Sequence, residues 1–181
     1  MTVLQAGPLS LRLLTAADWP LFLELHRQEQ VLQFVADPFT EDQILQRFEE
    51  RLQPWQAGDL HWLSLVVVEN QSGTATGVCG FHCLNVDADR PLTAEVGYLF
   101  LPAFFGKGYA TLALSACLNY GSELGIKAWQ AVVTEGILGS CRVLEKCGFH
   151  WVERQHNGYQ IGNQFVADLI YKKADSAGVT A

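Results

Sequence analysis

The stretch that decides the fold is EVGYLFLPAFFGKGYAT, from Glu95 to Thr111, which runs directly into the apolar segment 112–124. Its first half has the composition of a β-strand, and its second half is a glycine turn that opens a helix. The first N–H groups of a helix have no partner within the helix, and the helix dipole favours negative charge there. Gly106 and Gly108 let a ligand approach that backbone closely, so the turn is suited to hold a phosphate.

Two well-known nucleotide-binding loops do not fit this turn. A Walker loop with Lys107 as its lysine would need a glycine at Leu101 and a serine or threonine at Gly108. A dinucleotide-binding fingerprint would need a third glycine at Thr111. The residues therefore exclude both nucleotide folds, and an ordinary strand-to-helix turn remains the alternative to a phosphate site.

Length and composition predict one soluble domain. The chain has 181 residues, of which 49% are hydrophobic, enough to bury a full core. The net charge of -7 and the lack of a Lys/Arg run argue against nucleic-acid binding, and an acidic surface would suit a cationic substrate such as an amine. No apolar run of about 18 residues and no signal-peptide layout is visible, so we expect a cytoplasmic protein without a membrane partner.

The cysteines are predicted to be free, buried and unrelated to metal binding. Their number is odd and no CxxC pair occurs, which is typical of thiols in a reducing compartment. On a strand, Cys79 and Cys83 would share one face while His82 points to the other. On a helix, Cys141 and Cys147 would lie about 120° apart. We therefore expect Cys79, Cys83, Cys117, Cys141 and Cys147 to act as small core residues, with no metal site.

Hydrophobic periodicity and turn signals predict the order strand, two helices, three strands, helix, strand, helix and two strands. Capping boxes at Thr15 and Thr40 open the first two helices, and Leu21, Phe22 and Leu25 are expected to pack the first of them. The predicted strands are 9–14, 61–69, 77–86, the strand that contains Glu95, 128–134, 149–153 and 165–171, and the predicted helices are 15–28, 40–52, 112–124 and 140–147. Residues 1–7 and 174–181 are expected to be tails of a single domain spanning 1–181.

Three motifs carry a resemblance to a known family. A pattern of Gln or Arg, two residues, Gly, any residue, then Gly or Ala falls on Phe105, Gly108 and Ala110, with Phe105 in place of the usual Gln or Arg. Segment 140–149, SCRVLEKCGF, and segment 162–168, GNQFVAD, follow in order. Together they resemble the acetyl-CoA loop, fourth helix and closing strand of the GNAT superfamily of N-acetyltransferases, in the branch of ribosomal-protein alanine/serine and spermidine acetyltransferases.

The resemblance implies a fold and a cofactor site. The fold would be α/β, with a central mixed, mostly antiparallel, splayed sheet of about seven strands and about four helices. Acetyl-CoA would be the co-substrate, its pantetheine arm paired with the splayed strand and its pyrophosphate in the glycine turn. The implied cofactor-binding residues are Tyr98, Leu99, Phe100, Phe105, Gly106, Lys107, Gly108, Tyr109 and Ala110.

The resemblance also implies two catalytic residues. Glu95 would help to deprotonate the acceptor amine, and its alternative role is a solvated carboxylate at a strand end. Ser140 would protonate the departing thiolate, and its alternative role is a helix N-cap. Two further family positions are changed here, since Ile137 stands in place of an asparagine and Leu144 in place of a tyrosine that often serves as the acid.

The implied function is acetyl transfer from acetyl-CoA to a primary amine, either a protein N-terminus or a small amine, by direct attack in a ternary complex. The alternative is a non-catalytic acyl-CoA-binding or regulatory module of the same fold. Substrate choice would be set on the first two helices, around Phe34, Trp55 and the intervening residues, although core packing is the simpler role for each aromatic ring. A homodimer is a further expectation, because soluble proteins commonly form them.

Overall fold

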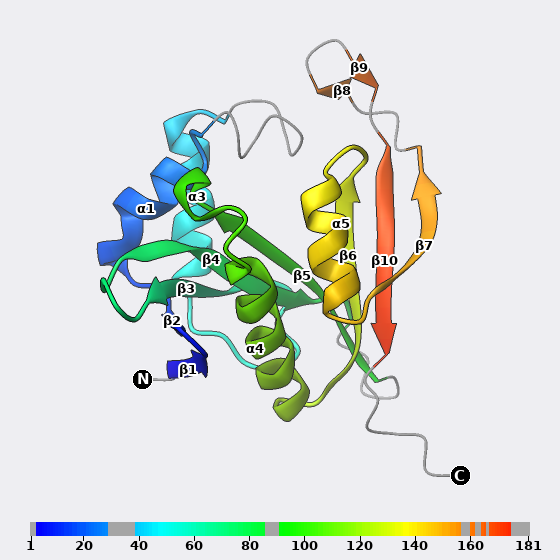
Figure 1. Cartoon of the computed structure of the whole chain (residues 1–181), viewed down its shortest axis with the longest axis horizontal. Helices are drawn as coiled ribbons and strands as arrows, with labels where there is room; N and C mark the ends of the chain where they lie inside the picture. The colour runs from blue at the N-terminus through cyan, green and yellow to red at the C-terminus, as the bar shows by residue number, and fades with distance from the viewer. Residues whose placement is uncertain are drawn as a thin grey trace.

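The computed structural model describes residues 3–28, 39–85, 91–156, 160–161, 164–165 and 167–174. Eight strands form one open sheet in the order β1-β2-β3-β4-β5-β6-β10-β7, and a separate two-stranded hairpin pairs β8 with β9 (Figure 1). The predicted Phe34 lies outside the described residues, as do residues 86–90 and much of the polar segment between the last two predicted strands.

The elements follow the predicted order closely. The strands are β1 Val3–Ala6, β2 Leu9–Leu13, β3 Leu63–Glu69, β4 Ala75–Cys83, β5 Leu92–Phe100, β6 Ile126–Thr134, β7 His150–Gln155, β8 Gln160–Ile161, β9 Gln164–Phe165 and β10 Asp168–Ala174. The α-helices are α1 Trp19–Leu25, α3 Glu41–Arg51, α4 Tyr109–Glu123 and α5 Leu138–Lys146, and the 3-10 turns are η1 Ala16–Asp18 and η2 Pro102–Phe104.

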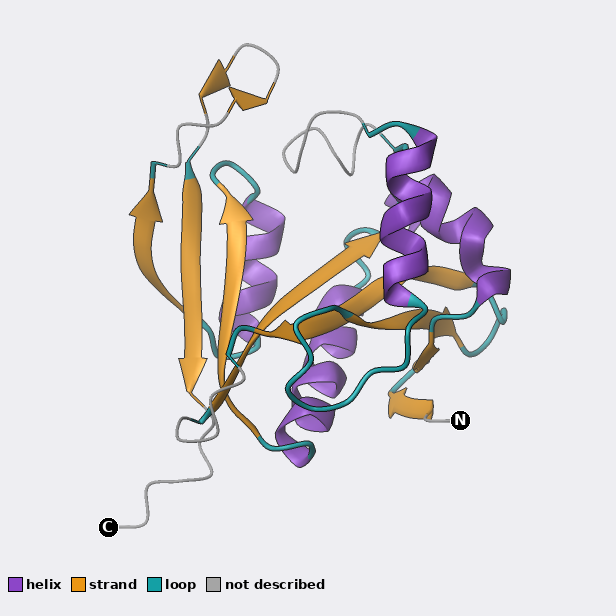
Figure 2. Ribbon diagram, turned by 180° about the vertical axis from the view of Figure 1, so that it is seen from behind, coloured by secondary structure: helices purple, strands orange, loops and turns teal. Residues whose placement is uncertain are grey.

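The sheet splits in its middle. Every neighbouring pair of its strands is antiparallel except β5 and β6, which run parallel from Leu92 opposite Ile126 to Glu95 opposite Gln130. Beyond Glu95, β5 pairs only with β4 and β6 only with β10, and Figure 2 shows the two strands diverging. The second half of β5 therefore has an edge with no strand partner in the described chain. This confirms the predicted mixed, splayed sheet.

Two hydrophobic cores cover the two faces of the sheet. Helices α4 and α5 pack on one face and α1 and α3 on the other, as the opposite views of Figures 1 and 2 show. Side chains alternate along β4, so Cys79 and Phe81 join the core under α4 while Val78 joins the core under α1 and α3. Phe22 and Leu25 are fully buried in the second core, as predicted.

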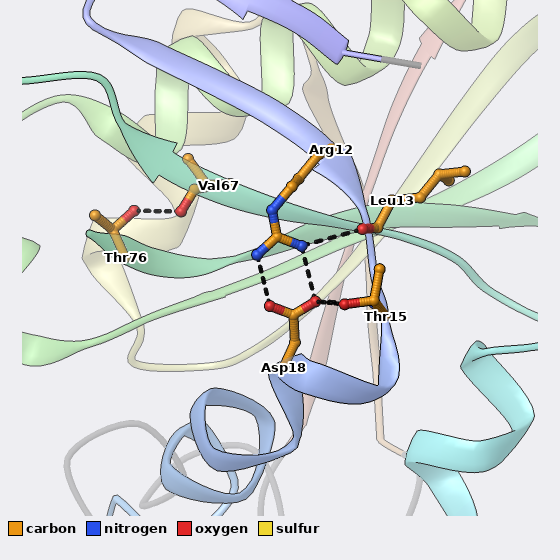
Figure 3. A network of polar contacts seen from close by, with 6 residues as sticks. All are labelled: Arg12, Leu13, Thr15, Asp18, Val67 and Thr76. Atoms are coloured by element: carbon orange, nitrogen blue, oxygen red, sulfur yellow. Dashed lines mark hydrogen bonds and ion pairs between the residues drawn. The ribbon is translucent and has the colours of Figure 1, made fainter. Parts of the chain in front are cut away.

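An ion pair fixes the start of α1 to the sheet (Figure 3). Arg12 on β2 makes a two-pronged contact with Asp18, with Nη2 to Oδ1 at 2.6 Å and Nη1 to Oδ2 at 2.8 Å. The backbone N–H and the hydroxyl of Thr15 each donate to Asp18 Oδ2 at 2.8 Å. The predicted capping signal at Thr15 is therefore present, although its first turn is the 3-10 turn η1.

The structure corrects several predicted boundaries. Residues 3–6 are not a tail, because they form β1 and pair with β2 across the turn at Gly7, whose φ is 62°. A four-residue strand shows too little alternation to be recognised in sequence. At the other end, β10 continues through Ala174, where the second tail was predicted to begin. Helix α1 ends at Leu25 rather than near Gln28, and α5 begins at Leu138 rather than at Ser140.

Candidate active site

The glycine turn has the backbone conformation that the sequence suggested. Gly106 and Gly108 have φ values of 75° and 77°, in the left-handed region that other residues rarely adopt. Gly108 is the N-cap of α4, so the unpaired N–H groups of the helix start next to it. A Cβ atom built on either glycine would meet no other atom within 4 Å, so both residues border open space.

That open space belongs to a cavity of about 590 Å³ between the turn, the end of β5 and the start of α5. All of the predicted cofactor residues line it except Lys107, whose ammonium nitrogen lies 4.7 Å from the centre of the Phe104 ring. Arg142 and Lys146, one helical turn apart on α5, also line it and were not predicted. Positive side chains beside a helix N-terminus are suited to an anionic ligand.

Large apolar side chains also line this first cavity. Phe105 is 52% exposed and Leu138 is 67% exposed, which is unusual for large apolar side chains. The residues present therefore fit a long ligand with a phosphorylated part and a less polar part. Ile137, where the family often has an asparagine, lines the same cavity as the N-cap of α5 and offers no polar side chain.

A second cavity, of about 420 Å³, adjoins the first and is lined by residues of both diverging strands. It is lined by residues of α3, β3, β4, β5, β6 and α5, and by His26 after α1. Tyr98, Leu99 and Ser140 line both cavities. The divergence of β5 from β6 therefore brings the two cavities together at these three residues.

Glu95 lies at the last paired position of β5 and β6, where the split begins. Gln130 Nε2 donates to Glu95 Oε2 at 3.1 Å, and His82 Nε2 lies 4.0 Å from Glu95 Oε1. The side chain is 23% exposed and lines the second cavity. Glu95 is thus within its strand and mostly covered, which does not fit the alternative of a solvated carboxylate at a strand end.

Ser140 is the third residue of α5, and the N-cap of that helix is Ile137. The serine therefore does not cap its helix, and its hydroxyl has no hydrogen-bond partner among the described residues. Tyr98 donates from its hydroxyl to the backbone carbonyl of Ser140 at 3.3 Å. Burial raises the pKa of Tyr98 well above its usual range, so this hydroxyl remains a neutral donor.

Sequence reasoning singled out none of four residues that line the second cavity, although two of them lie in the segment 34–55 that was expected to set substrate choice. Arg47 and Arg51 come from α3, Trp62 precedes β3, and His26 follows α1. The pKa of His26 is lowered to about 4, chiefly by burial, while the hydrogen bond to the Phe22 carbonyl opposes the shift and the charges of Arg51 and Arg47 add to it. No local motif marks these residues, because they meet only in the folded chain.

Trp55, by contrast, belongs to the core. Its Nε1 donates to the His61 carbonyl at 3.1 Å, and its ring meets Phe81 edge-on at 5.3 Å. It does not line the second cavity. Leu144, which occupies the family's tyrosine position, is 1% exposed and adds no proton donor to that cavity.

The five cysteines are free and buried, as predicted. Over the described ranges, no three His, Cys, Asp or Glu side chains are grouped so that they could hold a metal ion. In the same part of the chain, no helix has both the length and the apolar character needed to span a membrane.

Known proteins match both the sequence and the fold. Residues 9–150 match the acetyltransferase (GNAT) domain family. An uncharacterized N-acetyltransferase, YoaA of Bacillus subtilis, is 37% identical over 92 residues, covering 49% of this chain and 50% of that protein. The chain spans about half the length of the curated relatives that it matches.

Two solved structures share the fold at low identity. RimL, a ribosomal L7/L12 α-N-protein acetyltransferase in complex with coenzyme A, has a TM-score of 0.81 at 15% identity, covering 98% of this chain and all of that one. Spermidine N-acetyltransferase from Vibrio cholerae, in complex with CoA and spermine, has a TM-score of 0.79 at 17% identity, covering 94% and 97%. With the family match over most of its length and the split sheet of that fold, the chain belongs to the GNAT acetyltransferase family.

Proposed function

We propose that this protein is an acetyl-CoA-dependent N-acetyltransferase that moves an acetyl group to a primary amine by direct attack in a ternary complex. One observation carries the proposal, which is that two cavities share Tyr98, Leu99 and Ser140 at the split of the sheet. Two substrates held in adjoining cavities would meet at these residues, and such proximity supplies much of the rate of a two-substrate reaction. The second cavity therefore favours an enzyme over the alternative of a module that only binds acyl-CoA.

The first cavity would hold acetyl-CoA, which supplies an acetyl thioester when bound. The N–H groups of the turn around Gly106 and Gly108 would bind the pyrophosphate, with Arg142 and Lys146 adding positive charge. The unpaired edge of β5 at Tyr98, Leu99 and Phe100 would bind the pantetheine arm. An N–H donor on this edge would also polarise the thioester carbonyl.

The reaction forms a C–N bond and breaks a C–S bond. An amine enters as an ammonium ion, loses one proton before attack and loses a second as the amide forms. The departing thiolate takes up one proton, so one proton is released to solvent. A base near the amine and a proton donor near the sulfur would therefore speed the reaction.

Glu95 is the base in this proposal, and Ser140 is the donor. Glu95 faces the second cavity, and the N–H of Gln130 holds its carboxylate in place. It would accept the ammonium proton directly or through a water. The hydroxyl of Ser140 has no hydrogen-bond partner among the described residues and lies where the two cavities meet. This position suits delivery of a proton to sulfur.

The test combines acetyl-CoA binding with thiol release in the presence of a panel of amines. Calorimetry should detect binding of acetyl-CoA, and at least one amine should cause stoichiometric release of coenzyme A together with the acetylated amine. Binding without release for every amine would favour the non-catalytic module. Absence of binding would show that the assignment of the first cavity is wrong.

A further inference from the structure

The second cavity has an unusual distribution of charge. It is lined by two arginines, Arg47 and Arg51, and by one carboxylate, that of Glu95. His26, which also lines it, is uncharged at neutral pH because its pKa is about 4. The chain as a whole carries a net charge of -7, so a cavity with an excess of positive charge is a local exception.

Arg51 is held by two aromatic rings and has no ion-pair partner in the described part of the chain. Its guanidinium carbon lies 5.3 Å from the centre of the Phe22 ring and 5.3 Å from that of Trp62. In the described part of the chain, no carboxylate oxygen lies within 4.0 Å of it, although the charge of Glu50 acts on it from a greater distance. Burial lowers the pKa of Arg51 to about 10, with Arg47 adding to the effect, so the side chain is still charged at pH 7.

A half-buried cation that lacks a carboxylate partner among the described residues raises the free energy of the folded protein, and an anionic ligand would remove that penalty. The two aromatic rings restrict the guanidinium to one region, so little side-chain freedom is lost when a ligand binds. Arg47 adds a second cation, whose guanidinium carbon lies 4.1 Å from the centre of the Phe39 ring. The planar guanidinium is suited to a carboxylate or phosphate, which it can bind through two hydrogen bonds.

The arginine end of the cavity connects to Glu95 through a series of ring contacts. Trp62 lies under Arg51, its ring centre is 4.7 Å from that of His82, and His82 Nε2 is 4.0 Å from Glu95 Oε1. Gly97 leaves the room for Trp62, because a Cβ atom there would lie 2.8 Å from Trp62 Cη2. An acceptor in this cavity would therefore have its amine near Glu95 and a second group near Arg51.

We propose that the acceptor is a small amine that also carries an anionic group, a carboxylate or a phosphoryl group, and that Arg51 with Arg47 binds that group. The proposal rests on the proposed function and adds the class of substrate to it. A volume of about 420 Å³ suits a small molecule rather than a protein chain. Arg47, Arg51 and Trp62 also line an outer cavity of about 660 Å³ on the exposed side of α3, so the anion site can be reached from solvent.

The test uses pairs of amines that differ only in the anionic group, namely glycine with glycinamide and O-phosphoethanolamine with ethanolamine. For the wild-type protein, kcat/KM should be at least 100-fold higher for the anionic member of at least one pair. Arg51→Gln should raise KM for that member at least tenfold with little change in kcat. It should change kcat/KM for the neutral member far less, so that the ratio within the pair collapses, and Arg51→Lys should retain part of the preference.

The ratio within a pair separates charge recognition from general damage to the fold, because damage would affect both members alike. Arg27→Gln is the matched control, since Arg27 is an exposed arginine paired with Glu41 and lines neither cavity. If neutral amines are acetylated with the same kcat/KM as their anionic partners, the inference is wrong and the proposed function stays intact.

Acetylation of acidic peptides but of no small anionic amine would overturn the small-molecule assignment. If no amine is acetylated although acetyl-CoA binds, the proposed function fails instead, and calorimetry with O-phosphoethanolamine then decides whether Arg51 binds anions.

Discussion

At the scale of single residues, Glu95 combines three properties that a catalytic base needs: a fixed place in the sheet, a hydrogen-bonded carboxylate and access to the second cavity. It is the last residue of β5 that pairs with β6, it accepts a hydrogen bond from Gln130, and it faces the second cavity. Its neighbours hold the carboxylate in one place, as a base requires. The sequence identified the residue through the family resemblance, whereas its partners Gln130 and His82 come from two other strands.

Glu95→Gln tests the proposed base. The amide has nearly the same shape and cannot accept the ammonium proton, so turnover should fall about 100-fold or more while acetyl-CoA affinity changes little. Steady-state kinetics and calorimetry give the two quantities. Glu153→Gln on the exposed edge strand β7 is the control. Unaltered turnover in Glu95→Gln would mean that water alone removes the proton.

Ser140→Ala tests the proposed proton donor. The structure shows that the substitution removes the hydroxyl without removing a helix cap. Because Ile137 is the N-cap of α5, removal of the Ser140 hydroxyl takes away no cap and should leave the melting temperature nearly unchanged. Turnover should fall about tenfold or more at unchanged acetyl-CoA affinity. Ser122→Ala on α4 is the control for loss of a hydroxyl. Full activity in Ser140→Ala would leave water as the donor to sulfur.

At the scale of elements, the start of α4 serves binding, and glycines at its two ends provide a matched pair. Gly108 and Gly125 have φ values of 77° and 98°, and a Cβ on either would meet nothing within 4 Å. Alanine at each should therefore destabilise the fold by about 1–2 kcal/mol through backbone strain alone. Only Gly108 lines the first cavity, so only Gly108→Ala should weaken acetyl-CoA binding, by about tenfold. Equal acetyl-CoA affinities of the two variants in calorimetry would show that the glycine turn is not part of the acetyl-CoA site.

The packing of α4 on the sheet depends on a different glycine. A Cβ at Gly121 would lie 2.3 Å from Trp129 Cη2 and 3.1 Å from Phe81 Cζ, and those rings already pack edge-on against each other. Gly121→Ala should lower the free energy of unfolding by about 1–3 kcal/mol even though alanine favours helix. Gly139→Ala in α5, where a Cβ meets nothing, should be neutral or gain up to about 1 kcal/mol. Urea denaturation of both variants measures the contrast, and equal stabilities would show that the Trp129 ring can move aside.

At the scale of the whole molecule, the Arg12–Asp18 pair joins the sheet to the helices on its second face. Asp18 is 6% exposed, and burial alone would raise its pKa, but hydrogen bonds from Arg12 and Thr15 outweigh burial and lower the pKa below 3.8. A carboxyl whose pKa is lowered by folding stabilises the protein fully above its unfolded pKa. That contribution is lost as the pH falls through the folded pKa.

Asp18→Asn should therefore cost about 1–3 kcal/mol of unfolding free energy at pH 7, because Arg12 keeps its charge and loses its partner. The difference from the wild type should narrow below about pH 4 as Asp18 becomes protonated. Urea denaturation at several pH values measures both effects. A difference that stayed constant down to pH 2 would show that the ion pair is not its source. Glu135→Gln, which breaks an exposed pair with Arg154, should have a far smaller effect.

The sequence by itself determined the order of the elements, the capping signals at Thr15 and Thr40, and the position and nature of the glycine turn. These are local properties, since side-chain periodicity and the conformational freedom of glycine depend on a few neighbouring residues. The resemblance to the family added the splayed sheet, which the structure has, and the proposed catalytic roles of Glu95 and Ser140, which stay predictions. A four-residue strand such as β1 was missed because it carries too few residues for a pattern.

The tertiary structure alone decided where the sheet splits and that two cavities meet at Tyr98 and Ser140. It also decided that Arg51 lies against Phe22 and Trp62 with no ion-pair partner among the described residues. These features join residues from elements far apart in the chain, so no window of sequence contains them. The net charge of -7 suggested a cationic partner, whereas the second cavity carries an excess of positive charge. Net charge sums over the whole surface, but a ligand responds to the few charges that folding places around it.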